Sequence, residues 1–100
     1  MKSKPVDYLP GARLDLEQSA GWYETQEPGV GSRCLETVAL IEGNLQRDPG
    51  LGAPYRRNTR KWRLPRFPHS IIYREEADRI LIVAVAYPKR REGYWRRRLS

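Results

Sequence analysis

The pattern of apolar and polar residues is clearest at residues 79–87, where eight of nine residues are apolar or aromatic and none is Gly or Pro. A run of this length that is rich in β-branched side chains predicts a strand buried on both faces. Alternation along the strand predicts one face made of Ile80, Ile82, Ala84 and Ala86, and an opposite face made of Leu81, Val83, Val85 and Tyr87. Pro88 ends this strand, and the basic residues Lys89, Arg90 and Arg91 follow at once. We therefore expect a rigid apolar strand with a basic cluster at its end.

Two earlier segments have apolar residues at helical spacing. In residues 12–26 these are Leu16, Ala20 and Tyr23, and the other faces of the predicted helix carry Asp15, Glu17 and Glu24. In residues 32–47, with Ser32 as the expected cap, the apolar positions are Cys34, Leu35, Val38, Ile41 and Leu45. Pro and Gly at residues 27–31 and 48–50 interrupt the pattern. The two segments predict an antiparallel helix hairpin that covers one face of the strand.

Shorter stretches predict the remaining strands. Residues 6–9 form a short strand, residues 51–58 a loop, and residues 60–64 and 70–74 alternate as strands. In the first of these alternating strands, Trp62 and Leu64 lie on one face and Lys61 and Arg63 on the other.

These elements predict an α+β protein with one domain over residues 1–100. A short N-terminal strand and a two-helix hairpin pack on a small, mainly antiparallel sheet. We expect the sheet face away from the helices to be partly exposed.

Charge is distributed unevenly along the chain. The net charge of the whole chain is +7. Residues 1–50 hold five Lys or Arg against eight Asp or Glu, a net charge of −3, whereas residues 51–100 hold fourteen against four, a net charge of +10. The second half therefore favours an acidic partner such as nucleic acid, an acidic protein segment, or a protein already bound to nucleic acid.

Several classes of chemistry lack the residues that they require. Cys34 is the single cysteine, which excludes an internal disulfide and a cysteine metal site and indicates a small core residue. His69 is the single histidine, so a zinc site or a Ser-His-Asp triad lacks parts. No glycine-rich phosphate loop is present, and we expect no metal and no cofactor. No apolar run is long enough to span a bilayer, so we expect no membrane partner and a cytoplasmic location.

The second half also interleaves cations with aromatic residues, a pattern typical of nucleic-acid surfaces. The cations are Arg60, Lys61, Arg63, Arg66, Arg74, Lys89, Arg90 and Arg91, and the aromatic residues are Trp62, Tyr73, Tyr87, Tyr94 and Trp95. The composition fits a second interpretation equally well, in which these cations form a solvated basic face and Trp62 and Tyr73 lie in the core.

Three stretches, taken in order, resemble the RelE/ParE toxins of bacterial type II toxin–antitoxin systems. Residues 20–35, which read AGWYE and then PGVG and CL, resemble the helix hairpin of that family. Residues 66–74, RFPHSIIYR, resemble its second and third strands, and residues 83–95 resemble its last strand and C-terminal tail. The resemblance covers nearly the whole chain and agrees with the fold predicted above. It implies a toxin that a cognate antitoxin protein neutralises.

Two targets follow from this resemblance. Members of the ParE branch inhibit DNA gyrase and have no established nuclease site, whereas members of the RelE branch cleave mRNA on the ribosome. The WYE motif and the FPH turn are closer to the ParE, or plasmid-stabilisation, branch, so gyrase inhibition is our first interpretation. In the alternative, a ribosome-dependent mRNA endonuclease, the catalytic residues would be Lys89, Arg91 and Tyr94. A third possibility is a non-toxic family member that only binds its partner.

In either toxic case, a set of basic and aromatic residues in the second half is predicted to contact the target. These are Lys61, Arg63, Arg74, Tyr87, Lys89, Arg90, Arg91 and Trp95.

Overall fold

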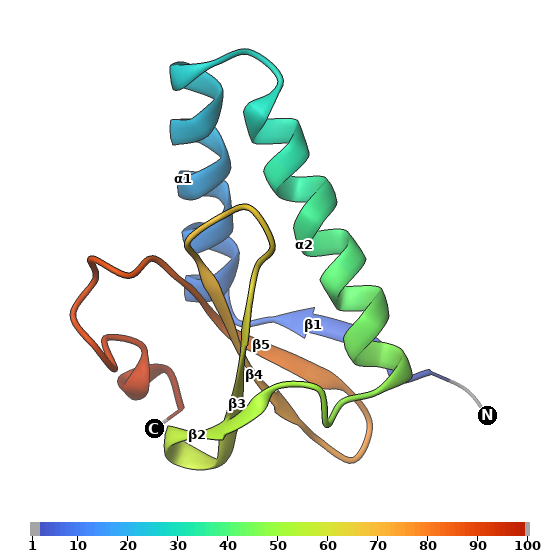
Figure 1. Cartoon of the computed structure of the whole chain (residues 1–100). Helices are drawn as coiled ribbons and strands as arrows, with labels where there is room; N and C mark the ends of the chain where they lie inside the picture. The colour runs from blue at the N-terminus through green and yellow to red at the C-terminus, as the bar shows by residue number, and fades with distance from the viewer. Residues whose placement is uncertain (1–2, 100) are drawn as a thin grey trace.

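The apolar run near the end of the chain forms strand β5 (Ile80–Ala86) in the computed structural model, which describes residues 3–99. It belongs to a five-stranded sheet of order β1-β5-β4-β3-β2. The other strands are β1 (Val6–Tyr8), β2 (Ala53–Tyr55), β3 (Thr59–Arg63) and β4 (Ser70–Glu75). β1 runs parallel to β5, and the remaining pairs are antiparallel (Figure 1). The predicted α+β class, the helix hairpin and the three-stranded meander are confirmed.

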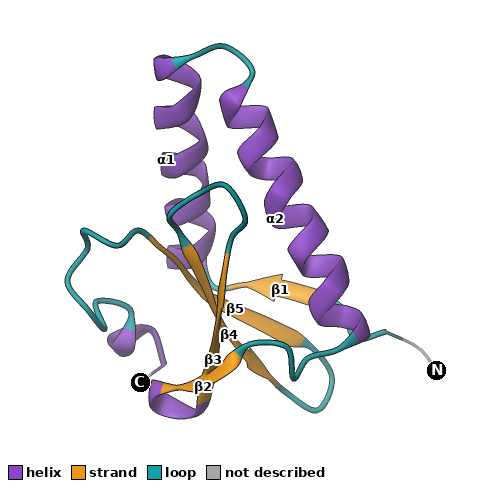
Figure 2. Ribbon diagram, viewed as in Figure 1, coloured by secondary structure: helices purple, strands orange, loops and turns teal. Residues whose placement is uncertain are grey.

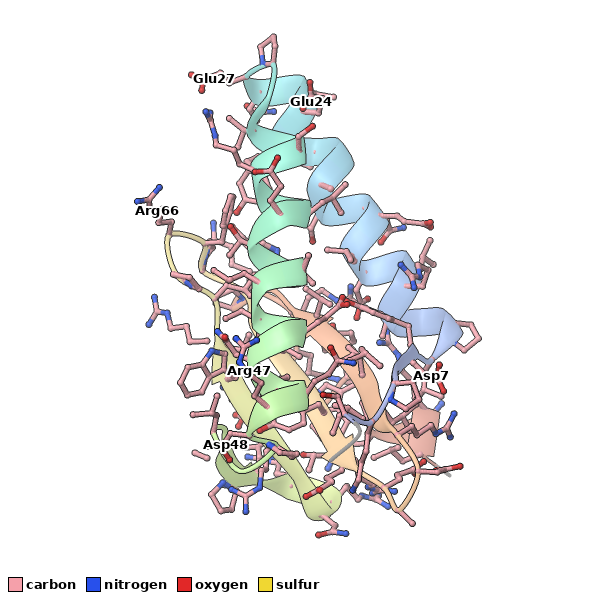
Figure 3. The ribbon with its side chains drawn as sticks, turned by 90° about the vertical axis from the view of Figure 1, so that its right-hand side faces the viewer. Asp7, Glu24, Glu27, Arg47, Asp48 and Arg66 are labelled. Atoms are coloured by element: carbon pink, nitrogen blue, oxygen red, sulfur yellow. The ribbon has the colours of Figure 1, made fainter. Side chains whose placement is uncertain are left out.

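The helix hairpin consists of α1 (Pro10–Gln26) and α2 (Val30–Arg47). α1 begins at Pro10, two residues before the predicted start, because proline suits the first position of a helix. α2 also begins earlier than predicted, and the expectation that Ser32 caps it is wrong. The carboxylate of Glu24 accepts hydrogen bonds from the backbone N–H of Gly29 at 3.0 Å and of Gly31 at 3.1 Å. A side chain of α1 therefore satisfies free N–H groups at the start of α2, at the tip of the hairpin (Figure 3).

Both helices pack on one face of the sheet. The main core joins helix and sheet residues, namely Ala12, Leu16, Val38, Ile41, Leu45, Leu64, Ile71, Tyr73, Ile80, Ile82 and Val85. The upper turns of the hairpin extend beyond the sheet (Figure 2). Cys34 is buried, as predicted. None of the helices within residues 3–99 combines the length and the apolar composition that a membrane-spanning helix requires.

A β-bulge interrupts the alternation of β5. Ile72 of β4 pairs with Ala84, and the next residue, Tyr73, pairs with Ile82, so Val83 has no partner on β4. Consequently Val83 and Ala84 both face away from the helices. The two predicted faces of this strand are correct up to Val83 and wrong from Ala84 onwards.

The C-terminal segment covers much of the sheet face opposite the helices. Tyr94, Trp95 and Leu99 pack there against a second cluster made of Ile72, Leu81, Val83 and Ala84. The segment ends in a short 3-10 helix, η2 (Arg96–Leu99), from which Arg98 reaches Asp15 of α1 and the carbonyl of Val83 in β5. This face is exposed at Lys61 and Arg63 of β3, which agrees with the prediction of a partly exposed face.

Residues 51–58 were predicted to form a loop, but the structure shows that they include the short strand β2. Pro54 lies within this three-residue strand at the edge of the sheet, where proline is tolerated. The hydroxyl of the buried Tyr73 anchors the preceding chain: it accepts from the N–H of Gly52 at 2.8 Å and donates to the carbonyl of Pro49 at 2.7 Å. Tyr73 is therefore a core residue and not part of a binding surface.

Candidate functional site

A cavity of about 740 Å³ lies between β3 and the chain that follows β5. In Figure 1 this chain loops out from β5 and returns towards β2. The charged and aromatic residues that line the cavity are Lys61, Arg63, Arg90, Arg91, Glu92, Tyr55, Tyr87, Tyr94 and Trp95. We call it the basic cavity.

β3 places two cations in the basic cavity. Lys61 and Arg63 pair with Ile72 and Ser70 of β4, and both side chains point away from the helices, whereas Trp62 packs towards the helix-side core. This arrangement confirms the two faces predicted for the strand. The ammonium of Lys61 lies 4.9 Å from the centroid of the Tyr55 ring, a cation–π contact across the β2–β3 pair.

The loop at residues 87–93 carries the remaining cations of the cavity. Two backbone hydrogen bonds close its turns. The N–H of Arg90 donates to the carbonyl of Tyr87 at 3.0 Å, and the N–H of Tyr94 donates to the carbonyl of Arg91 at 3.1 Å. Glu92 accepts from Arg56 at 2.8 Å and from the hydroxyl of Tyr55 at 3.2 Å. These contacts tie the loop to β2 and the turn that follows it.

The hydroxyl of Tyr94 is held by Asp15 of α1. It donates to the Asp15 carboxylate at 2.8 Å. Burial raises the pKa of Tyr94 well above its usual value, and this hydrogen bond raises it further. Tyr94 therefore stays protonated, with its one proton engaged by Asp15. The prediction that Asp15 lies on an outer face of the helix is wrong, because its side chain is 6% exposed and faces the C-terminal segment.

The cavity brings together six of the predicted target-binding residues, namely Lys61, Arg63, Tyr87, Arg90, Arg91 and Trp95. Lys89 is exposed on the same loop but does not line the cavity. Arg74 binds the carbonyls of Arg57 and Asn58 instead, in a turn where both of those residues have positive φ.

Trp95 touches the cavity, but the expectation that it is exposed on a contact surface is wrong. Only 1% of the residue is exposed, because its ring packs in the second core cluster.

Sequence reasoning missed Tyr55, Arg56 and Glu92. Residues 51–58 contain Gly and Pro and only a three-residue strand, so the alternation was too short to detect. The aromatic and basic residues Tyr55-Arg56-Arg57 were the one signal available in that stretch.

A smaller cavity of about 340 Å³ lies on the α1 side of β5. His69 lines this cavity and is only 3% exposed. Its Nε2 atom lies 3.0 Å from Oγ of Ser19, within hydrogen-bonding distance. Nδ1 of His69 has no hydrogen-bond partner among residues 3–99. Burial lowers the pKa of this imidazole below 6.5, although the charge of Asp15 opposes the shift. His69 thus links α1, through Ser19, to the start of β4.

Among residues 3–99, no three His, Cys, Asp or Glu side chains are grouped so that they could hold a metal ion.

Solved structures of toxin–antitoxin systems share this fold. A structure described as the chromosomal ParDE system from P. aeruginosa matches with a TM-score of 0.74 and 20% identity, covering 85% of this chain and 96% of that chain. The RelBE2 toxin–antitoxin complex from Mycobacterium tuberculosis matches with a TM-score of 0.55 and 23% identity, covering 86% and 99%. No curated protein sequence matches the chain significantly.

The fold with its helix hairpin and sheet is therefore one that occurs in solved toxin–antitoxin systems. The sequence profile described as the ParE toxin of the type II toxin–antitoxin system, parDE, matches residues 6–92. This chain belongs to the ParE toxin family, which confirms the family inferred from the sequence.

Proposed function

We propose that this toxin inhibits DNA gyrase and that a cognate antitoxin neutralises it. The family profile over residues 6–92 supports the ParE branch. The observation that carries the choice of mechanism is the 2.8 Å hydrogen bond from Tyr94 to Asp15. It engages the proton of the phenol that an endonuclease of this fold would need, which favours inhibition by binding over phosphodiester cleavage.

The basic cavity is the proposed contact surface for the target. Lys61, Arg63 and Arg91 are exposed and carry no carboxylate partner among residues 3–99. Cations in a concave site concentrate field and attract phosphates or carboxylates, both of which a gyrase–DNA complex presents.

One observation favours the second candidate, a ribosome-dependent mRNA endonuclease. Lys61, Arg63 and Arg91 line the same cavity as Tyr94, and converging cations can stabilise the charge that develops on a phosphate during cleavage. This mechanism requires Tyr94 to leave Asp15 when RNA binds. The third predicted catalytic residue, Lys89, would also have to turn towards the cavity.

The antitoxin is proposed to be an acidic, amphipathic segment. The hairpin exposes large apolar side chains, namely Leu14, Trp22, Leu35 and Leu40. Apolar helix surfaces bind amphipathic partners, and the positive charge of residues 51–100 favours an acidic one. Co-expression that yields no complex and does not relieve toxicity would count against this partner.

One experiment separates the two targets. The purified toxin is added to gyrase supercoiling and DNA-cleavage assays and, in parallel, to translating ribosomes with a labelled mRNA. We expect loss of supercoiling, intact mRNA, and full recovery when antitoxin is added. Ribosome-dependent mRNA cleavage with normal gyrase activity would establish the endonuclease instead. A protein that binds antitoxin but affects neither assay would be a non-toxic family member.

A further inference from the structure

The Asp15 carboxylate binds four donor groups from the C-terminal part of the chain. Its Oδ2 accepts from the hydroxyl of Tyr94 at 2.8 Å, from Arg98 at 2.8 Å, and from the backbone N–H of Val85 at 3.2 Å. Its Oδ1 accepts from the second guanidinium nitrogen of Arg98 at 3.1 Å. A nearly buried carboxylate of α1 thus holds both β5 and the chain after it.

This network lies where the sheet loses its neighbouring strand. β1 pairs with β5 only over residues 80–82, so the next backbone groups on that edge need other partners. Asp15 accepts from the N–H of Val85, and Arg98 donates to the carbonyl of Val83 at 3.0 Å. The Asp15–Arg98 pair therefore continues the edge of β5 past the bulge, in place of a strand.

The network also reaches the loop that carries the cavity cations. The guanidinium of Arg90 lies 3.9 Å from the centroid of the Tyr94 ring, and its Nη1 lies 4.0 Å from Oδ1 of Asp15. Arg90 lines both the basic cavity and the smaller cavity on the α1 side, and its neighbour Arg91 lines the basic cavity. Asp15 consequently acts on the loop twice, through Tyr94 and through Arg90.

We propose that Asp15 is a positioning residue for the toxic surface: it fixes the loop at residues 87–93 so that Arg91 faces Lys61 and Arg63 across the basic cavity. This inference rests on the proposed role of that cavity in target binding. Asp15 itself contacts no target, because its side chain is buried beneath the C-terminal segment.

A purely structural role would also make Asp15 important, so the test must separate stability from positioning. Asp15→Asn alone leaves the charge of Arg98 poorly compensated in a site where the Arg98 side chain is 21% exposed. The double variant Asp15→Asn/Arg98→Gln removes both charges and keeps amide groups that can hydrogen-bond to each other and to β5. Its melting temperature should recover most of what Asp15→Asn loses.

The matched control is Glu42→Gln. Glu42 accepts a hydrogen bond from the hydroxyl of Tyr8, a second carboxylate–tyrosine contact between a helix and the sheet. It lies outside both cavities, so this variant should leave the loop and the toxicity unchanged.

Two readouts are measured on each variant, growth inhibition at equal levels of folded toxin and hydrogen exchange of the amides of residues 87–94. In the double variant we expect about tenfold faster exchange in this loop and about tenfold weaker growth inhibition, while antitoxin affinity changes less than about twofold. If the double variant keeps the loop exchange and the toxicity of the parent, Asp15 serves folding only and the proposal is wrong.

The exchange measurement does not depend on the target. If the parent fails to inhibit gyrase, the proposed function is wrong. The positioning role would still be supported if the loop amides exchange slowly in the parent and faster in the double variant. Should the double variant not fold, Tyr94→Phe takes its place, because it removes one hydrogen bond to Asp15 and keeps the ring that contacts Arg90. Unchanged loop exchange in Tyr94→Phe would then overturn the proposal.

Discussion

A Cβ atom on Gly11 would lie 2.6 Å from Nε of Arg98, although the two residues stand near opposite ends of the chain. Gly11 lies in the first turn of α1, four residues before Asp15. The guanidinium of Arg98 passes over this position to reach the Asp15 carboxylate. The absence of a side chain at residue 11 is therefore part of what holds the C-terminal segment in place.

Replacing Gly11 by Ala should displace the Arg98 side chain. We expect the free energy of unfolding to fall by about 1–2 kcal/mol, the scale of hydrogen bonds to a charged group. Chemical denaturation measures this change. The control is Gly21→Ala in the same helix, where a Cβ meets nothing within 4 Å. That substitution should stabilise the protein by roughly 1 kcal/mol, because alanine favours helix more than glycine does. Equal stabilisation by both substitutions would show that Arg98 has room to move at no cost.

Gly31→Ala tests the contact between the two helices. A Cβ atom on Gly31 would lie 2.5 Å from the backbone carbonyl oxygen of Ala20, which cannot rotate away as a flexible side chain can. The helices must separate, at a cost of about 1–3 kcal/mol, typical of overpacking. Thermal melting should show a lower midpoint for Gly31→Ala than for the parent, whereas Gly21→Ala should melt higher. An unchanged midpoint would mean that the helix hairpin adjusts freely.

The sequence was sufficient for the elements that have long patterns. The helices extend over seventeen and eighteen residues, and β5 over seven, so their periodicity could be recognised. β2 could not be recognised, because three residues that include Pro54 carry no alternation. The bulge at Val83 was also hidden, since it depends on how β4 pairs with β5 and not on the apolar run itself.

The same limit applies to the candidate site. The cations of β3 and of the loop after β5 were identified from charge and strand alternation. Asp15 and Trp95 were misplaced because their surroundings come from distant segments. Asp15 looked like an ordinary solvent-facing acid of an amphipathic helix until Arg98, 83 residues further along, was placed against it. Trp95 looked like part of an exposed basic tail until the tail was found to pack on the sheet.

His69 makes stability sensitive to mild acid. Because burial lowers its pKa in the folded state, the unfolded chain binds a proton more readily below the ordinary pKa of 6.5. Stability should therefore be full at neutral pH and should decrease as pH falls below about 6.5, until the folded-state pKa is reached. Denaturation at pH 7.5 and at pH 5.5 measures the effect, with His69→Gln as the control, since glutamine does not titrate. The same loss of stability in both proteins would assign it to other groups.

The final prediction concerns the cations of the basic cavity. Lys61→Ala, Arg63→Ala and Arg91→Ala each remove an exposed charge, so the free energy of unfolding should change by no more than roughly 0.5 kcal/mol. Arg90 is a poor probe because it also contacts Tyr94.

We expect each of the three substitutions to weaken growth inhibition and the triple variant to abolish it, while the antitoxin still binds through the helix hairpin. The control is Arg97→Ala, which removes an exposed cation outside the cavity and should leave toxicity intact. Binding measured over a range of salt concentrations identifies the contacted groups. If the cations meet phosphates of the gyrase–DNA complex, the slope of log K against log salt should become shallower by about one for each cation removed. A triple variant that melts like the parent and arrests growth equally well would place the toxic surface elsewhere on the molecule.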